Sequence, residues 1–195
     1  MMKVLAKSIS YLFIPPLNLL AIFTYLAVSV YTDSTLRNKT ILIAAIFGFV
    51  LPLIVFFYLR WKGKIVDNEA SDGSERTTPY LIGIGLSVLG AMLSMVFELH
   101  PFIVALWLSY VLTSFILVLI NKRWKISAHA IGVSIPFAVL IFQLGNSAYY
   151  FIAIPILVSW ARIYLKLHDI YQVVAGFLLG YLVTYYLMNL SLNLI

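Results

Sequence analysis

Cysteine is absent from this chain of 195 residues, so disulfide bonds and thiolate metal sites are excluded. Charge is scarce, because only 10% of the residues are Asp, Glu, Lys or Arg, whereas about a quarter is usual in soluble domains. Histidine occurs three times, as His100, His129 and His168. The rest is strongly apolar, with 63% hydrophobic residues and a mean hydropathy of +1.03. This composition excludes a soluble globular domain and predicts an integral membrane protein.

Apolar runs long enough to cross a membrane recur along the whole chain. A helical span needs about 20 mainly apolar residues, because the hydrocarbon core of a bilayer is about 30 Å thick. The runs are continuously apolar rather than alternating, which favours helices over a barrel. We therefore predict an all-α, polytopic transmembrane helix bundle that forms a single domain over residues 1–195. Its expected seven spans cover residues 8–30, 40–60, 79–98, 101–120, 127–145, 147–165 and 170–191.

The first of these runs has two particular features. It begins like a signal peptide, but its apolar stretch is too long and no small-residue cleavage site follows, so we expect a retained span. It also contains Pro15 and Pro16. Proline removes a backbone donor and clashes with the preceding helical turn, so this pair should kink the span or make it re-entrant.

Basic residues are distributed unevenly if the seven spans alternate in direction. The end of the bundle that carries the N-terminus, here called the cation-rich end, would hold eleven Lys and Arg residues, and the opposite end only Arg37 and Lys39. Such a bias places the cation-rich end in the cytoplasm. The net charge of +6 therefore indicates membrane lipids as partners rather than nucleic acid. The eleven residues are Lys3, Lys7, Arg60, Lys62, Lys64, Arg76, Lys122, Arg123, Lys125, Arg162 and Lys166.

Three polar stretches converge on the cation-rich end in this topology. They are "GSERTTP" at residues 73–79, "KISAH" at residues 125–129 and "ARIYLKLHDIYQ" at residues 161–172. Polar residues at the edge of a membrane span are costly and commonly functional. If the third stretch is helical, His168 and Gln172 share a face, which makes Gln172 a better candidate than Asp169 to orient the imidazole.

The third stretch resembles a motif of the type 2 phosphatidic acid phosphatase superfamily, whose members are membrane lipid phosphatases. The family motif is S-R-x5-H-x3-D. Arg162 and His168 stand at the family spacing, with Ala161 in place of the serine and Gln172 in place of the aspartate. A glutamine at this place is also similar to the dolichyl diphosphate phosphatase branch.

The two other motifs of the family, P-S-G-H and K-x6-R-P, are present in altered form. The first of these appears as "ISAH", which keeps Ser127 and His129. The other is reduced to Arg76, which is followed by "TTP", and Glu69 stands where the lysine is expected. The resemblance covers about residues 60–180.

The resemblance implies a six-helix phosphatase-like core and a lipid phosphatase that needs no metal or cofactor. In this family one histidine attacks phosphorus, a second protonates the departing oxygen, and cations hold the phosphate. Phosphoryl transfer depends mainly on positioning and on stabilising charge, so these residue types suit the reaction. Carried onto this chain, the nucleophile is His168, the acid is His129, the orienting residue is Gln172, and the phosphate-binding residues are Arg162, Arg76, Lys125 and Ser127.

Several alternatives stay open at this point. An isoprenyl diphosphate is the slightly preferred substrate because of the third motif, and phosphatidic acid or phosphatidylglycerol phosphate is the alternative. A catalytically silent protein that binds lipid phosphates is an alternative of another class, favoured by the weak K-x6-R-P motif and the neutral Gln172. In the cell membrane, the cation count predicts a cytoplasmic active face and the family resemblance an extracytoplasmic one. The sequence predicts no oligomeric state.

Overall fold

The computed structural model describes residues 1–65 and 73–194, and of residues 73–76 only the backbone. Within these ranges the chain is helical and has no β-strand, which confirms the predicted all-α class. Three short helical segments are of other types: the π-helix η1 (Ala44–Val50) and the 3-10 helices η2 (Gly145–Ile152) and η3 (Leu192–Leu194). The α-helices are α1 (Met2–Leu12), α2 (Pro15–Val30), α3 (Ser34–Ile43), α4 (Leu51–Trp61), α5 (Gly73–Val96), α6 (Pro101–Asn121), α7 (Ala128–Leu144), α8 (Ala153–Tyr164) and α9 (Ile170–Ser191).

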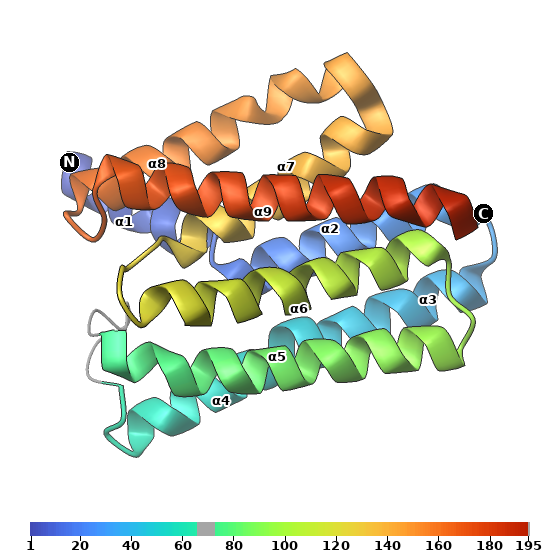
Figure 1. Ribbon diagram of the computed structural model, residues 1–195, viewed down its shortest axis with the longest axis horizontal. Coiled ribbons are helices and arrows are strands. Elements are labelled where there is room, and N and C mark those ends of the chain that lie inside the picture. Colours follow the sequence, from blue (N-terminus) through green and yellow to red (C-terminus); the bar gives the residue numbers. More distant parts are fainter. Residues whose placement is uncertain (66–72, 195) are drawn as a thin grey trace.

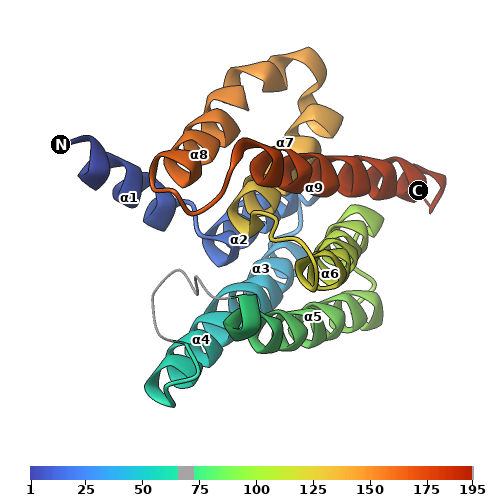
Figure 2. The ribbon, with the colours of Figure 1, turned by 60° about the vertical axis from the view of Figure 1, so that its left-hand side comes forward.

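Helices α2 and α6 lie at the centre of the bundle. Figures 1 and 2 show α7, α8 and α9 on one side of this pair and α3, α4 and α5 on the other. The core is aromatic, since Phe23 of α2 lies against Trp107 of α6 with ring centroids 4.4 Å apart. The Trp107 indole also occupies the space that a side chain at Gly90 of α5 would need. One buried ring system therefore holds α2, α5 and α6 together.

The first predicted span is broken at its two prolines. Helix α1 ends before Pro15, α2 begins with it, and the two helices are bent by 53°. Proline is tolerated as the first residue of a helix, because the N–H that it lacks would have no helical partner there. Helix α1 packs against α8, whereas α2 packs against α6 and α7. The expected kink is confirmed, and it separates an outer helix from a central one.

The described part of the chain contains five helical segments that are long and apolar enough to cross a membrane, or six if α1 and α2 form one bent span. These helices are those expected of a multi-pass membrane protein, but they do not confirm the seven spans. The difference lies in residues 128–164, where α7, η2 and α8 form one helical run that Figure 1 shows turning back at η2.

The expected span over residues 147–165 is not continuously α-helical, because its first part belongs to η2. Residues 145–152 form η2, which begins at Gly145 with a φ of 55°. A positive φ suits glycine and breaks the preceding helix. Helix α8 itself has 12 residues, a length of about 18 Å, so a membrane crossing by this segment would have to include η2.

The two ends of the bundle collect different connections. Figure 1 shows the N-terminus, the end of α4, the α6–α7 connection and the α8–α9 connection at one end. The opposite end holds the α2–α3 connection, the α5–α6 connection and the C-terminus. The expected convergence of residues 125–129 and 161–172 on one end is therefore observed. This end carries the candidate site.

Candidate active site

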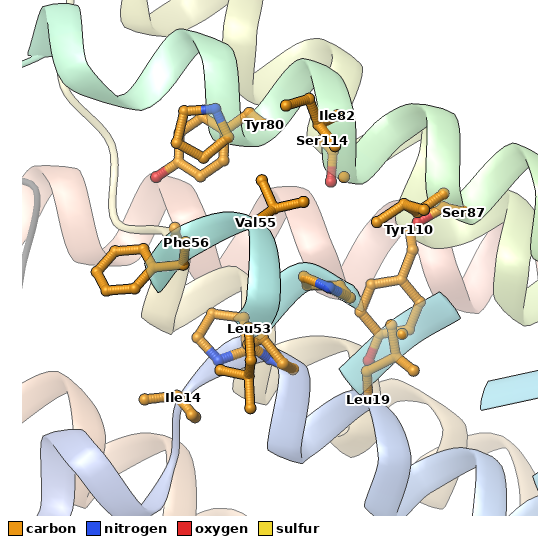
Figure 3. Close-up of a pocket in the computed structure, with 18 of the residues that line it drawn as sticks. Ile14, Leu19, Leu53, Val55, Phe56, Tyr80, Ile82, Ser87, Tyr110 and Ser114 are labelled. Atoms are coloured by element: carbon orange, nitrogen blue, oxygen red, sulfur yellow. The ribbon is translucent and has the colours of Figure 1, made fainter. Parts of the chain in front are cut away.

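A cavity of about 570 Å³ lies between α2, the η1–α4 segment, α5 and α6 and reaches the cation-rich end. Most of its wall is apolar. Figure 3 shows Ile14, Leu53, Val55 and Ile82 on its walls, and it shows Leu19 beside Tyr110. Ligand pockets commonly combine such an apolar wall with a few polar groups.

The polar groups of this cavity include three residues that the sequence singled out. His129 from the first turn of α7, Arg162 from the last turn of α8 and His168 from the α8–α9 connection all line it. Arg162 is 2% exposed and His168 is 6% exposed. A guanidinium that lines a cavity is a planar, charged hydrogen-bond donor of the kind that suits an anionic ligand. The cavity therefore joins a cationic mouth to an apolar interior.

The imidazole of His168 is held by Gln172. Its Nδ1 lies 3.0 Å from Oε1 of Gln172. The same Oε1 accepts the backbone N–H of Asp169 at 3.3 Å, while the Asp169 carboxylate accepts the backbone N–H of Gln172 at 2.8 Å. This pair of bonds is a capping box at the start of α9. The contact between His168 and Gln172 was expected because the two residues would share a helix face. His168 instead precedes α9, and the contact forms because the capping box holds the Gln172 side chain at the start of the helix.

The capping box also determines the tautomer of His168. Because Oε1 of Gln172 receives the Asp169 N–H, the amide presents its oxygen, which only accepts, to the imidazole. Nδ1 of His168 must then carry the hydrogen of the 3.0 Å bond. In the neutral ring the basic nitrogen is consequently Nε2, the atom that a nucleophilic histidine in this orientation would use.

Arg162 organises the connection that carries His168. Its carbonyl oxygen accepts the backbone N–H groups of Leu167 at 3.1 Å and of His168 at 3.4 Å. Lys166 has a φ of 57°, so the chain turns sharply between the two site residues. Nη1 of Arg162 donates to Oγ of Ser10 in α1 at 2.6 Å. The side chains of Arg162 and His168 are thus both attached to one tightly hydrogen-bonded backbone turn.

Ser127 lies at the junction of two helix starts. It is the N-cap of α7, where its Oγ accepts the backbone N–H of Ala130 at 3.3 Å. Its backbone N–H donates to the carbonyl of Gln172 at 3.1 Å. A Cβ at Gly176 would lie 2.6 Å from the Ser127 carbonyl oxygen. Ser127 therefore fixes the start of α7, which carries His129, to the start of α9, and it is not one of the residues that line the cavity.

The two other expected phosphate-binding cations are Lys125 and Arg76. Lys125 lies half-buried in the α6–α7 connection, two residues before the α7 N-cap, and it does not line the cavity. Arg76 belongs to the first turns of α5, but its side chain lies outside the described residues. Of the expected cations, the structure brings Arg162 together with the two histidines.

Two residues of the candidate site, Ser10 and Asp169, were not predicted from the sequence. Ser10 is fully buried against Arg162 although the two residues are 152 positions apart, and no local pattern marks it. The capping role of Asp169 did carry a signal, since Asp followed three residues later by Gln resembles a capping-box sequence.

Among the residues that the structure describes, no group of three His, Asp or Glu side chains could hold a metal ion. The chain has no significant match among protein-family models, curated proteins or solved structures.

Proposed function

We propose that this protein is a membrane lipid phosphatase that hydrolyses a lipid phosphate or diphosphate monoester through a phosphohistidine. One observation carries the proposal: a buried arginine and two histidines line one end of an otherwise largely apolar cavity. A lipid phosphate has the same polarity, with an anionic head and an apolar tail. The type 2 phosphatidic acid phosphatase motifs point to the same chemistry.

The residues divide the reaction into two balanced steps. In the first, Nε2 of His168 attacks phosphorus, the bond to the leaving oxygen breaks, and His129 gives that oxygen its proton. In the second, His129 takes a proton from water, the water oxygen bonds to phosphorus, and the N–P bond breaks to release phosphate and neutral His168. Arg162 stabilises the charge on the phosphoryl oxygens in both steps.

The apolar part of the cavity would hold the lipid tail. Its walls come from α2, α4 and α5 and are formed mainly by aliphatic and aromatic side chains. An isoprenyl diphosphate is our preferred substrate, because Gln172 matches the dolichyl diphosphate phosphatase branch. Phosphatidic acid and phosphatidylglycerol phosphate present the same phosphate to the same cations, and they form the second substrate group to assay.

The test is phosphate release by purified protein in detergent from an isoprenyl diphosphate, phosphatidic acid and phosphatidylglycerol phosphate. His168→Ala and His129→Ala should each abolish turnover, and radiolabelled substrate should label the wild type but not His168→Ala. The matched control is His100→Asn, which changes the chain's remaining histidine while keeping a side-chain acceptor for the α6 N-cap. This control should retain activity.

Turnover that survives in His168→Ala would refute the nucleophile. If the wild type binds these lipids but hydrolyses none, the function is lipid-phosphate binding, the alternative suggested by the neutral amide of Gln172 in place of a carboxylate.

We place the active face in the cytoplasm on the cation count. Because the chain has no cysteine, single substitutions give unique labelling sites. Lys64 follows α4, Tyr150 belongs to η2, and both side chains are exposed. Figure 1 shows the end of α4 and η2 toward opposite ends of the bundle. A membrane-impermeant thiol reagent applied to intact cells should label Tyr150→Cys and not Lys64→Cys, and the reverse result would place the site on the outer face.

A further inference from the structure

The contact between Ser10 and Arg162 connects the first helix of the chain to the candidate site. Nη1 of Arg162 donates to Oγ of Ser10 at 2.6 Å, and both residues are buried, at 2% and 0% exposure. A hydrogen bond from a charged donor is stronger than a neutral one, and burial removes the competition of water. This bond therefore restrains the guanidinium that lines the cavity.

Helix α1 places the Ser10 hydroxyl against α8. Its buried residues are Ala6 and Ser10, which stand four positions apart and so share one face of the helix. That face lies on α8, the helix that carries Arg162. Figures 1 and 2 show α1 beside α8 at the cation-rich end. The small side chain of Ala6 permits close approach, and Ser10 supplies the polar contact.

The residue next to Arg162 does not provide such a contact. Position 161, where the family motif has serine, is a fully buried alanine. A hydroxyl from α1 contacts the guanidinium in this chain instead. An arginine side chain has many rotamers, and a bond at Nη1 restrains the plane of the guanidinium.

We propose that Ser10 is a positioning residue of the active site, which orients Arg162 toward the phosphoryl group, so that α1 is part of the catalytic unit. The inference rests on the proposed phosphatase function. Ser10 does not contact the substrate in this proposal, because it acts through the guanidinium. Loss of its hydroxyl should therefore weaken stabilisation of the transition state more than binding of the lipid tail.

The experiment compares Ser10→Ala and Ser10→Thr with Ser94→Ala in the full-length protein. Ser94 is also a fully buried helical serine, but its hydroxyl donates to the Gly90 carbonyl of α5. Ser10→Ala should lower kcat roughly tenfold or more and leave KM nearly unchanged, as expected for the loss of a bond to a charged group. Ser10→Thr keeps the hydroxyl and should retain most of the rate. Ser94→Ala should match the wild type.

Inhibition by orthovanadate provides a readout that a merely structural role would not change. The inhibition constant should rise in Ser10→Ala, while the melting temperature should fall no further than in Ser94→Ala. A rate and an inhibition constant equal to those of Ser94→Ala would overturn the proposal. A loss of melting temperature that accounts for the lost rate would also overturn it.

The test also distinguishes this inference from the proposed function. If the wild type releases no phosphate from any lipid, the phosphatase proposal fails, and binding of inorganic phosphate then decides the role of Ser10. Weaker thermal stabilisation by phosphate in Ser10→Ala than in the wild type would support a role in orienting an anion-binding arginine. Equal stabilisation, or none in either protein, would overturn it.

Discussion

Oε1 of Gln172 lies 3.0 Å from Nδ1 of His168 and also accepts the backbone N–H of Asp169. The residue that orients the imidazole is therefore part of the start of α9. Gln172→Leu removes both bonds, so we expect the phosphatase rate to fall by at least roughly 10-fold to 100-fold, the range found for groups that orient a functional histidine through its other ring nitrogen. Asp169→Ala is the matched control, because it removes the N-cap and keeps the amide. It should cost about 1 kcal/mol of stability and little activity. Equal rates for the two variants would contradict this assignment.

Gly176 lies where α9 crosses the start of α7. An added Cβ would lie 2.6 Å from the carbonyl oxygen of Ser127, and a backbone atom cannot move aside as a side chain can. We expect Gly176→Ala to destabilise the protein by about 1–3 kcal/mol and to reduce activity, because it separates the helix starts. Gly85→Ala, whose added Cβ meets no atom within 4 Å, should be neutral or slightly stabilising. Thermal unfolding in detergent measures both changes, and a neutral Gly176→Ala would disprove the close contact.

The Tyr110 hydroxyl is buried and has no hydrogen-bond partner among the described residues. An unsatisfied buried donor costs free energy, so Tyr110→Phe should leave the stability unchanged or raise it by about 1 kcal/mol. Tyr31→Phe is the opposite case, because the Tyr31 hydroxyl accepts the backbone N–H of His100. That variant should lose about 1 kcal/mol. Melting temperatures in the same detergent compare the pair, and a clear loss in Tyr110→Phe would reveal a partner for its hydroxyl.

His100 predicts a pH dependence of stability at the opposite end of the bundle. Its Nδ1 accepts the backbone N–H of Phe102 at the start of α6, and burial lowers the pKa of the imidazole. Above the unfolded pKa of about 6.5 both states are neutral and the contribution is complete. As the pH falls through that value, the unfolded chain takes up the proton more readily, so stability is lost toward the lower pKa of the folded state.

The measurement is the difference in melting temperature between the wild type and His100→Asn. Asparagine can also cap α6 but does not titrate in this range. Since the other two histidines are common to both proteins, the difference isolates His100. We expect the wild type to lose stability relative to His100→Asn between about pH 7 and about pH 5. A difference that stays constant with pH would refute the assignment.

The positions of the long helices could be predicted because hydrocarbon thickness imposes a minimum apolar length. The predicted spans 101–120 and 170–191 correspond to α6 (Pro101–Asn121) and α9 (Ile170–Ser191). The η2 segment was not foreseen, because mean apolarity does not distinguish a 3-10 helix from an α-helix. Its cause is the local conformation at Gly145, whose positive φ ends α7.

One contact within the candidate site could be predicted because its two residues are close in sequence. The spacing of His168 and Gln172 was sufficient to propose their contact, although the reason differs from the one expected. Ser10 could not be foreseen, because its partner depends on how α1 packs on α8. Ser127 shows another limit: the sequence marks a hydroxyl at a helix start, but not that the hydroxyl caps its own helix.

The bond between Ser10 and Arg162 also constrains how the protein is made, because it joins residues 152 positions apart. During synthesis α1 is made well before its partner on α8. The residue that orients His168 comes later still, at the start of α9. A nascent chain that stops before α9 can therefore contain most of the bundle and still be inactive. Under the proposed phosphatase function, activity would then report that translation and membrane insertion have reached α9.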